Sequence, residues 1–276
     1  MEDETIAGEE PEEIEEEQKG HVRPRDRLKK GIYLFPNLVT SAGLMLGFTS
    51  ILKGFDGEFV FAAWAIAAAM IFDGLDGKIA RLTRTTSEFG VQYDSLADLV
   101  SFGVAPGVLI YNFALRHSFS PGLGWAIALL FTICGALRLA RFNVQSATVD
   151  GKWFVGMPIP AGAGVLATTV LFFNDIGWVT STGITTCPNL ILLLTLVVAL
   201  LMVSTAPYWA AKEFQLFRRH AFSTLFLAII FLVIIIREPQ RTLFVMGMLY
   251  LLSGPVVWLV RSRGDKEEDL VEERVD

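Results

Sequence analysis

The chain has 276 residues, of which 53% are hydrophobic and only 19% are charged. This composition excludes a disordered chain and a typical soluble domain, and it indicates an integral membrane protein. We expect no nucleic-acid partner. We also expect no zinc site, because the three histidines are scattered without metal-ligand spacing. Cys134 and Cys187 lie far apart and are interpreted as small apolar residues.

The two ends of the chain differ in charge from its middle. Residues 1–20 form an acidic tail that we expect to be disordered, since it has almost nothing to bury. Residues 21–33 are a basic juxtamembrane segment that either binds anionic headgroups at the membrane surface or only anchors the chain. A transmembrane catalytic domain is predicted at 34–262, and a charged cytoplasmic tail follows at 263–276.

Long apolar stretches fill most of the chain. A membrane-spanning helix needs about 20 mostly apolar residues, and Gly, Pro and polar clusters divide the chain into segments of about that length. We therefore predict an all-α integral membrane protein with about eight transmembrane helices. The predicted spans are 34–53, 59–83, 88–115, 121–143, 158–175, 189–208, 221–236 and 242–261.

Lysine and arginine predict the orientation, because cytoplasmic loops of membrane proteins carry an excess of them. With eight spans and a cytoplasmic N-terminus, 19 of the 23 basic residues lie on the cytoplasmic side. The exceptions are Lys53, Arg116, Arg237 and Arg241. We expect both termini in the cytoplasm and, for a prokaryotic chain, a location in the inner (cell) membrane.

Four aspartates lie in the second and third predicted spans. An ionised carboxylate in hydrocarbon costs at least about 2.5 kcal/mol, so four of them need a function. Asp73 and Asp76 are three residues apart and share one helix face. Asp94 and Asp98 are four apart and share a face of the next helix. A tight turn at 82–88 would let the two acidic faces converge.

Converging carboxylates repel one another unless a cation neutralises them. Mg²⁺, Mn²⁺ and Ca²⁺ prefer oxygen ligands of this kind, and two such ions would suit phosphoryl chemistry. Gly77, Ala80 and Gly90 leave bare helix surface on which a flat ligand such as a nucleotide could lie. Arg81 could pair with a phosphate. A structural hydrogen-bonding role would be credible for one buried aspartate but does not account for four at this spacing.

The pattern Asp73-x2-Asp76-Gly77-x2-Ala80-Arg81-x8-Gly90-x3-Asp94-x3-Asp98 resembles the complete signature of the CDP-alcohol phosphotransferase family. The resemblance implies a six-helix core, here with two extra helices, and usually a homodimer. It also implies that a metal-bound CDP-linked lipid reacts with an alcohol and that CMP leaves. In this reading the four aspartates hold the metals, Asp98 is also the general base, and the CDP site is lined by Gly77, Ala80, Arg81 and Gly90.

Segments outside the signature narrow the resemblance. Residues 35–40, 94–106, 138–143 and 156–160 are similar to the membrane-embedded phosphatidylserine synthases of this family, and the similarity covers about residues 30–260. It implies CDP-diacylglycerol as the donor, L-serine as the acceptor, and phosphatidylserine and CMP as the products. General-base and metal catalysis would suffice, with no covalent intermediate.

Polar residues near the predicted cytoplasmic ends are further candidates for substrate binding. Arg138 and Arg141, with Asn143 beside them, could hold the carboxylate of serine or the phosphates of the donor. Alternatively, the two arginines only satisfy the positive-inside rule. Asn37 could contact the cytosine or a phosphate, or it could cap the first helix.

Other functions remain open on sequence grounds. Glycerol 3-phosphate or inositol phosphate as the acceptor would need a denser basic cluster than two arginines, and choline would need an aromatic cage. A cation transporter could use the carboxylates as ion ligands, but transporters often contain repeated halves, and this acidic cluster occurs once. The intact signature argues against a catalytically inactive scaffold.

Overall fold

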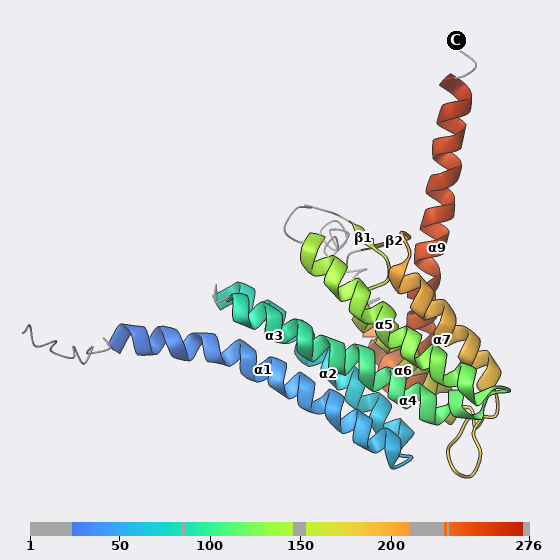
Figure 1. Ribbon diagram of the computed structural model, residues 1–276, viewed down its shortest axis with the longest axis horizontal. Coiled ribbons are helices and arrows are strands. Elements are labelled where there is room, and N and C mark those ends of the chain that lie inside the picture. The colour runs from blue at the N-terminus through green and yellow to red at the C-terminus, as the bar shows by residue number, and fades with distance from the viewer. Residues whose placement is uncertain (1–23, 84–86, 146–152, 210–228, 231, 273–276) are drawn as a thin grey trace, which may run out of the picture.

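The computed structural model describes residues 24–83, 87–145, 153–209, 229–230 and 232–272. In this part of the chain the dominant structure is a bundle of helices (Figure 1), which confirms the predicted all-α class. The α-helices are α1 (Pro24–Phe55), α2 (Phe59–Thr83), α3 (Glu88–Asp98), α4 (Ala105–Phe113), α5 (Pro121–Gln145), α6 (Ile159–Asp175), α7 (Pro188–Val203) and α9 (Pro239–Glu272). A π-helical segment, η1 (Leu99–Val104), joins α3 to α4, and a 3₁₀ turn, η2 (Leu115–His117), follows α4.

The lengths of these helices agree with a membrane protein. Within the described ranges, five helical segments are long and apolar enough to cross a membrane: Asn37–Phe55, Phe59–Ile79, Glu88–His117, Gly122–Val144 and Pro239–Val260. The helices α6 and α7 are apolar but shorter, with 17 and 16 residues. These lengths lie near the lower limit for a transmembrane helix. In the predicted span 221–236, residues 229–230 and 232–236 are described and helical, and the others lie outside the described residues.

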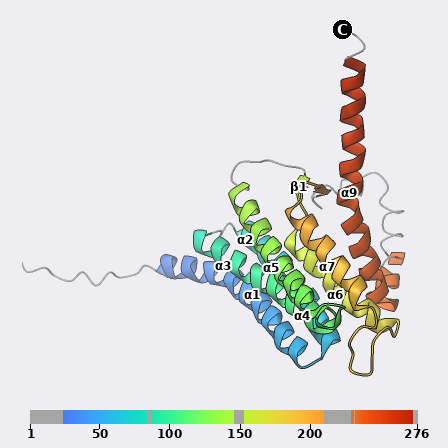
Figure 2. The same ribbon diagram turned by 45° about the vertical axis from the view of Figure 1, so that its right-hand side comes forward.

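Two helices extend beyond the spans predicted from hydrophobicity. The first helix already begins at Pro24, so the basic segment and the first span form one helix from that residue on. Proline is favoured at the start of a helix because its fixed φ fits and its missing N–H is not needed there. The last helix continues to Glu272, and its C-terminal part projects from the bundle in both views (Figures 1 and 2).

The end of α7 corrects one predicted boundary. Span 189–208 was expected to be helical throughout, but the helix ends at Val203, after which Ser204 has an extended backbone. Residues Pro207–Trp209 then form the strand β2, which pairs antiparallel with β1 (Trp153–Val155). This two-stranded ribbon was not predicted from the sequence. It begins on the loop between α5 and α6, so two segments far apart in the chain meet there.

The helix α6 lies at the centre of the bundle. It contacts α2, α4, α7 and α9, and most of its side chains are buried. Large fully buried side chains fill the interior of the bundle. They include Leu166 and Leu171 of α6 itself and, from other helices, Phe102, Phe113 and Phe131. In a membrane the helices gain little from hydrophobic exclusion, so close packing of this kind stabilises the bundle.

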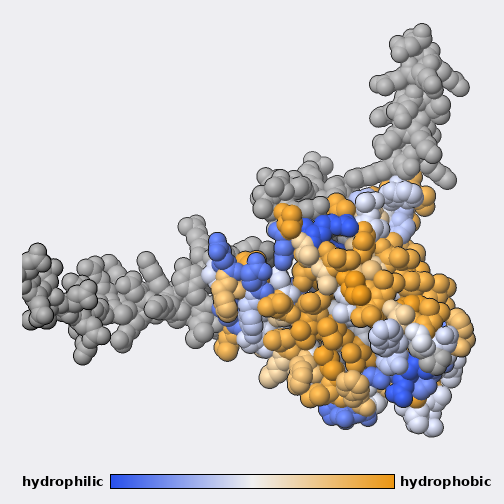
Figure 3. Space-filling view, in the orientation of Figure 1, coloured by the Kyte–Doolittle hydropathy of each residue, from blue (hydrophilic) through white to orange (hydrophobic). Residues whose placement is uncertain are grey.

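The outer surface of the bundle is apolar. Figure 3 shows hydrophobic side chains over most of the visible face, with hydrophilic residues gathered at its margins. Large exposed apolar residues occur on α1, α7 and α9; examples are Leu38, Met45, Phe48, Leu193, Leu200, Leu249 and Val256. A contiguous apolar surface of this extent on a helical bundle fits contact with lipid.

Close packing of α1 against η1 depends on glycine. A Cβ atom placed on Gly47 would lie 2.5 Å from Ser101 Oγ and 2.7 Å from Ser101 Cα. Ser101 Oγ donates a hydrogen bond of 3.3 Å to the carbonyl oxygen of Gly43. Small residues at such a contact let two membrane helices approach closely, so Gly47 permits the packing of α1 on η1.

Candidate active site

The helix α2 supplies the first two aspartates. Its N-terminal part is rich in alanine, the best helix-forming residue, and buried positions such as Ala62, Ala63 and Ala69 pack it into the bundle. Asp73 is half-buried and Asp76 is only 4% exposed. Both aspartates therefore lie in the protein interior.

The helix α3 supplies the other two aspartates. It begins after Ser87, whose Oγ accepts a 3.0 Å hydrogen bond from the backbone N–H of Gly90 and so caps the helix. One turn later the helix carries Asp94, and Asp98 is its last residue. Both aspartates are half-buried.

All four aspartates line one small cavity, together with Thr40, Gly43, Ala97, Ser101 and other residues of α1, α2 and η1. Its volume is about 10 Å³, room for about one water-sized particle. Carboxylate oxygens of Asp73, Asp76 and Asp94 lie within 4.8 Å of one another. Asp98 lines the cavity without joining that closest group, although its carboxyl group is within hydrogen-bonding reach of Asp73.

The electrostatics of this cavity favour a bound cation. Among the described residues that line it, none carries a positive charge. The Oδ1 atom of Asp94 is buried and has no hydrogen-bond partner. Buried carboxylates in a low-dielectric region are costly unless they are paired or bind a metal. Carboxylate oxygens are the ligands that hard divalent cations prefer, so this set of donors fits such an ion.

The helix α1 holds the two acidic helices in place. It packs against both α2 and α3 more extensively than these two pack against each other. Thr40 Oγ1 donates a 2.8 Å hydrogen bond to Asp76 Oδ2 on α2. The neighbouring Ser41 shares a 2.8 Å hydroxyl–hydroxyl bond with Tyr93 on α3. The acidic faces of α2 and α3 therefore meet, as predicted, at a cavity that α1 also lines.

A π-helical segment follows Asp98 directly. The N–H of Ala105 binds the carbonyl oxygen of Val100, five residues earlier. Pro106 comes next in the chain and has no N–H, so it cannot continue an α-helical ladder back to Phe102. Short π-helical segments inside α-helices often mark functional sites, and this one begins directly after Asp98, the residue expected to be the general base.

The structure describes some of the residues expected to bind CDP but not the side chains of all of them. Asn37 and Gly90 are neighbours, because a Cβ on Gly90 would lie 3.3 Å from Asn37 Oδ1. Gly77 is half-buried, one residue after Asp76. The side chains of Ala80 and Arg81 lie outside the described part of the structure. The structure therefore brings Asn37 and Gly90 together near the cytoplasmic end predicted for α1 and α3.

The three polar residues of α5 have different surroundings. Asn143 Nδ2 donates a 2.9 Å hydrogen bond to Ser95 Oγ, next to Asp94 in the chain. Arg141 donates to the carbonyl oxygens of Val203 at 2.9 Å and Ser204 at 3.4 Å. These are end groups of α7, so Arg141 acts as a cationic cap there. Arg141 therefore ties α5 to the C-terminal end of α7, whether or not it also contacts a substrate.

Arg138 lies deeper in the bundle than Arg141. It is only 6% exposed, and its guanidinium carbon lies 5.2 Å from the centre of the Phe142 ring. A buried guanidinium is unusual in a membrane protein and faces the bundle interior when it occurs. Neither arginine lines the carboxylate cavity among its described residues.

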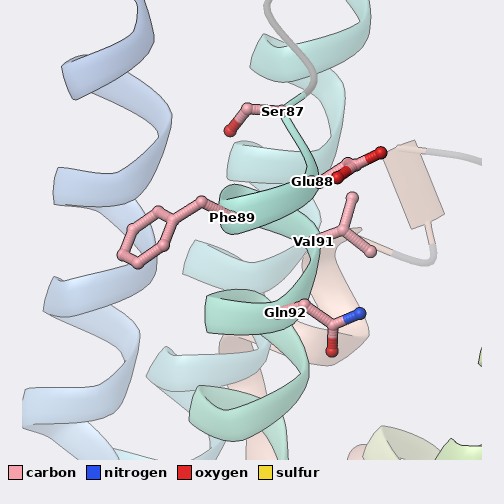
Figure 4. A pocket seen from close by; sticks show the side chains of 5 residues that line it. All are labelled: Ser87, Glu88, Phe89, Val91 and Gln92. Carbon is pink, nitrogen blue, oxygen red and sulfur yellow. The ribbon is translucent and has the colours of Figure 1, made fainter.

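An open hollow of about 680 Å³ lies at the N-terminal end of α3. Figure 4 shows Ser87 and Phe89 pointing toward α1, and Glu88, Val91 and Gln92 pointing to the other side of α3. The ring of Phe89 is stacked on Tyr93, with 6.0 Å between ring centres. The hollow is of the size that small ligands occupy in proteins, and it lies on the helix that carries Asp94 and Asp98.

Sequence reasoning missed three features of this site. It assigned no role to Thr40, although the residue stands in the 35–40 segment, and none to the Ser41–Tyr93 contact. It also did not predict the π-helical segment, for which Pro106 inside an apolar stretch was an available signal.

Comparisons with known proteins agree with this site. The family described as CDP-alcohol phosphatidyltransferase matches residues 33–200. The chain is 40% identical over 228 residues to the CDP-diacylglycerol–serine O-phosphatidyltransferase of Helicobacter pylori, covering 83% of this chain and 92% of that protein. It is 42% identical over 169 residues to the protein of the same name from Mycobacterium leprae, covering 58% and 55%.

An archaeal relative extends the comparison. The chain is 38% identical over 145 residues to the archaetidylserine synthase of Methanothermobacter thermautotrophicus, covering 51% of this chain and 60% of that protein. The family match spans more than half of the chain and includes all four aspartates. The expected resemblance is thus confirmed, and the chain belongs to the CDP-alcohol phosphatidyltransferase family of membrane enzymes.

Proposed function

We propose that this enzyme transfers the phosphatidyl group from CDP-diacylglycerol to the hydroxyl of L-serine, giving phosphatidylserine and CMP. The observation that carries the proposal is the cavity lined by four aspartates of the family signature. The choice of serine is supported by the names of the relatives, which include two serine phosphatidyltransferases and an archaetidylserine synthase.

The proposed cofactor is a divalent metal, Mg²⁺ or Mn²⁺ with Ca²⁺ as an alternative, held by Asp73, Asp76, Asp94 and Asp98. The unpartnered Asp94 Oδ1 and the absence of cationic residues from the described lining support it. When bound, the metal would neutralise the carboxylates and the pyrophosphate and stabilise charge on the departing CMP. We expect two ions. The present cavity of about 10 Å³ is too small for both, so the carboxylates would have to move apart to admit the second ion.

Asp98 is the proposed general base. It takes the proton from the serine hydroxyl while that oxygen forms a bond to the lipid-side phosphorus. The bond from this phosphorus to the bridging pyrophosphate oxygen breaks, and CMP leaves with the electron pair. Asp98 lines the same cavity but is not one of the three carboxylates whose oxygens all lie within 4.8 Å of one another. This position supports a role for Asp98 beyond metal binding.

The remaining polar residues are proposed to hold the substrates. Asn37, Gly77, Ala80, Arg81 and Gly90 would bind the CDP group. Arg138, Arg141 and Asn143 would bind the serine carboxylate or the donor phosphates. Asn143 has the most direct structural support, because its hydrogen bond to Ser95 places it beside the helix of Asp94 and Asp98.

The proposal also includes the setting of the enzyme. The acyl chains of the donor stay in the bilayer while its CDP group enters from the cytoplasm, where both termini also lie. A homodimer in the inner membrane is proposed from the family resemblance. The excess of basic residues on one side of the predicted spans supports this orientation.

The acceptor is tested with purified protein reconstituted with CDP-diacylglycerol and Mn²⁺ or Mg²⁺. Release of CMP is followed with serine, glycerol 3-phosphate, inositol phosphate, choline or no alcohol. We expect metal-dependent release only with serine, together with a new aminophospholipid on chromatography. Release with a different alcohol would refute the serine assignment. No release with any alcohol, from protein that binds Mn²⁺, would refute the transferase proposal and favour ion transport.

A further inference from the structure

Thr40 belongs to the wall of the carboxylate cavity without being part of the aspartate signature. It is only 7% exposed and lies on α1, a helix that carries none of the four aspartates. Its hydroxyl donates a hydrogen bond of 2.8 Å to Asp76 Oδ2. A hydrogen bond to a charged group is stronger than a neutral one, and this one joins two different helices.

This bond reaches a carboxylate on another helix, whereas several threonines in the described helices bond locally. Thr169, Thr195 and Thr49 each donate to the carbonyl oxygen four residues earlier in their own helix, at 2.7, 2.8 and 2.7 Å. Such bonds are the common local alternative for a helical threonine. The bond from Thr40 to Asp76 joins residues 36 positions apart in the chain. The contact therefore fixes the rotation of one particular carboxylate.

We propose that Thr40 is a positioning residue that orients the Asp76 carboxylate for divalent-cation binding. The proposal rests on the proposed metal site. One oxygen of Asp76 is held by the Thr40 hydroxyl, so the carboxylate group has a fixed orientation before a cation binds. Partners of this kind orient metal ligands in many sites, and their loss commonly weakens metal affinity about 10–100-fold.

The position of α1 makes this role effective. It packs on both acidic helices, and these have little direct contact with each other. The next residue, Ser41, binds Tyr93 on α3. Through two adjacent hydroxyls, α1 therefore contacts both halves of the acidic site. A purely structural role would hold the helices together without affecting the carboxylate, and the experiment must separate these two roles.

The experiment measures Mn²⁺ binding to purified protein in detergent by the electron paramagnetic resonance signal of free Mn²⁺, without substrates. The variants are Thr40→Val, which removes the hydroxyl at nearly constant size, and Thr40→Ser, which keeps it. Thr49→Val is the matched control, because it removes a hydroxyl of the same helix that binds only Met45 in the described contacts. Asp76→Asn serves as the reference for loss of the carboxylate charge.

We expect Thr40→Val to weaken Mn²⁺ binding about 10–100-fold, while Thr40→Ser and Thr49→Val bind as the wild type does. The melting temperature of the metal-free protein shows whether each variant folds. If Thr40→Val does not fold, the Thr40→Ser variant still decides, because binding much weaker than wild type would contradict a role for the hydroxyl.

Two results would overturn the inference in different ways. Wild-type affinity in folded Thr40→Val, alongside weak binding in Asp76→Asn, would refute the role of Thr40 and leave the metal site intact. Absence of Mn²⁺ binding by the wild-type protein, or unchanged binding in Asp76→Asn, would refute the proposed metal site and the inference with it.

Discussion

The proposed chemistry depends on single residues, and the four aspartates among them could be identified from the sequence. A carboxylate in an apolar helix is costly, so four of them at three- and four-residue spacing stand out. The contact of Thr40 with Asp76 could not be read in this way. A helical threonine commonly bonds to its own backbone, as Thr49 does, and only the packing of α1 against α2 brings the Thr40 hydroxyl to Asp76.

Asp73 provides the most direct test of the ligand assignment. Its carboxylate belongs to the group of three whose oxygens lie within 4.8 Å. We expect Asp73→Asn to weaken Mn²⁺ binding by at least about tenfold, since loss of even an indirect partner commonly costs that much. The concentration of Mn²⁺ needed for half-maximal CMP release should rise in parallel.

Asp56→Asn is the control for this measurement. Asp56 is exposed in the α1–α2 turn, where it forms an ion pair with Lys53, and exposed pairs contribute little to stability. The control should keep the metal requirement of the wild type. An unchanged metal requirement in Asp73→Asn would exclude Asp73 as a ligand.

At the scale of elements, hydrophobicity located most helices but not their irregular parts. The stretch 88–115 reads as one continuous helix, whereas the structure contains a π-helical segment at Leu99–Val104. A run of apolar residues does not show whether each N–H binds the carbonyl oxygen four residues earlier, as in an α-helix, or five residues earlier, as in a π-helix. The end of α7 at Val203 was missed because apolar residues resume in the strand β2 after only two polar ones, Ser204 and Thr205.

The contact between α1 and η1 gives a prediction about helix packing. Gly47→Ala would place a Cβ atom 2.7 Å from the backbone Cα of Ser101, which cannot move as a flexible side chain can. We expect the variant to lose about 1–3 kcal/mol of stability, as overpacked cores typically do, and to melt at a lower temperature in detergent.

Gly122→Ala is the matched control for this packing prediction. Gly122 is a helical glycine in α5, and a Cβ placed there meets nothing within 4 Å. This control should be neutral or slightly stabilising, because alanine is the better helix former. A Gly47→Ala protein as stable as the wild type would show that α1 and η1 can separate without cost.

At the scale of the whole molecule, the sequence predicted the all-α class of the fold. It could not predict the pairing of β1 with β2, since this contact joins residues 153–155 to residues 207–209. Pairing across so many residues depends on the packing of α6 and α7 between them and leaves no local signal. The order of the helices was accessible because each span is separated from the next by polar, Gly or Pro residues.

Orientation in the membrane gives a prediction for the intact cell. Thr182 and Val144 are both exposed and lie at opposite ends of the bundle, after α6 and at the end of α5. In a Cys187→Ser background, we expect Thr182→Cys to react with a membrane-impermeant maleimide in intact cells. Val144→Cys should react only after the cells are permeabilised. Labelling of Val144→Cys from outside would contradict a cytoplasmic active site.

The most direct test of the central claim is serine-dependent CMP release by Asp98→Asn, compared with the wild type and with Asp56→Asn. A general base typically contributes about 10²–10⁴-fold to the rate. We therefore expect kcat to fall by at least about a hundredfold, while the purified variant keeps its fold and still binds CDP-diacylglycerol. Near-normal turnover by Asp98→Asn would contradict the assignment of Asp98 as the base.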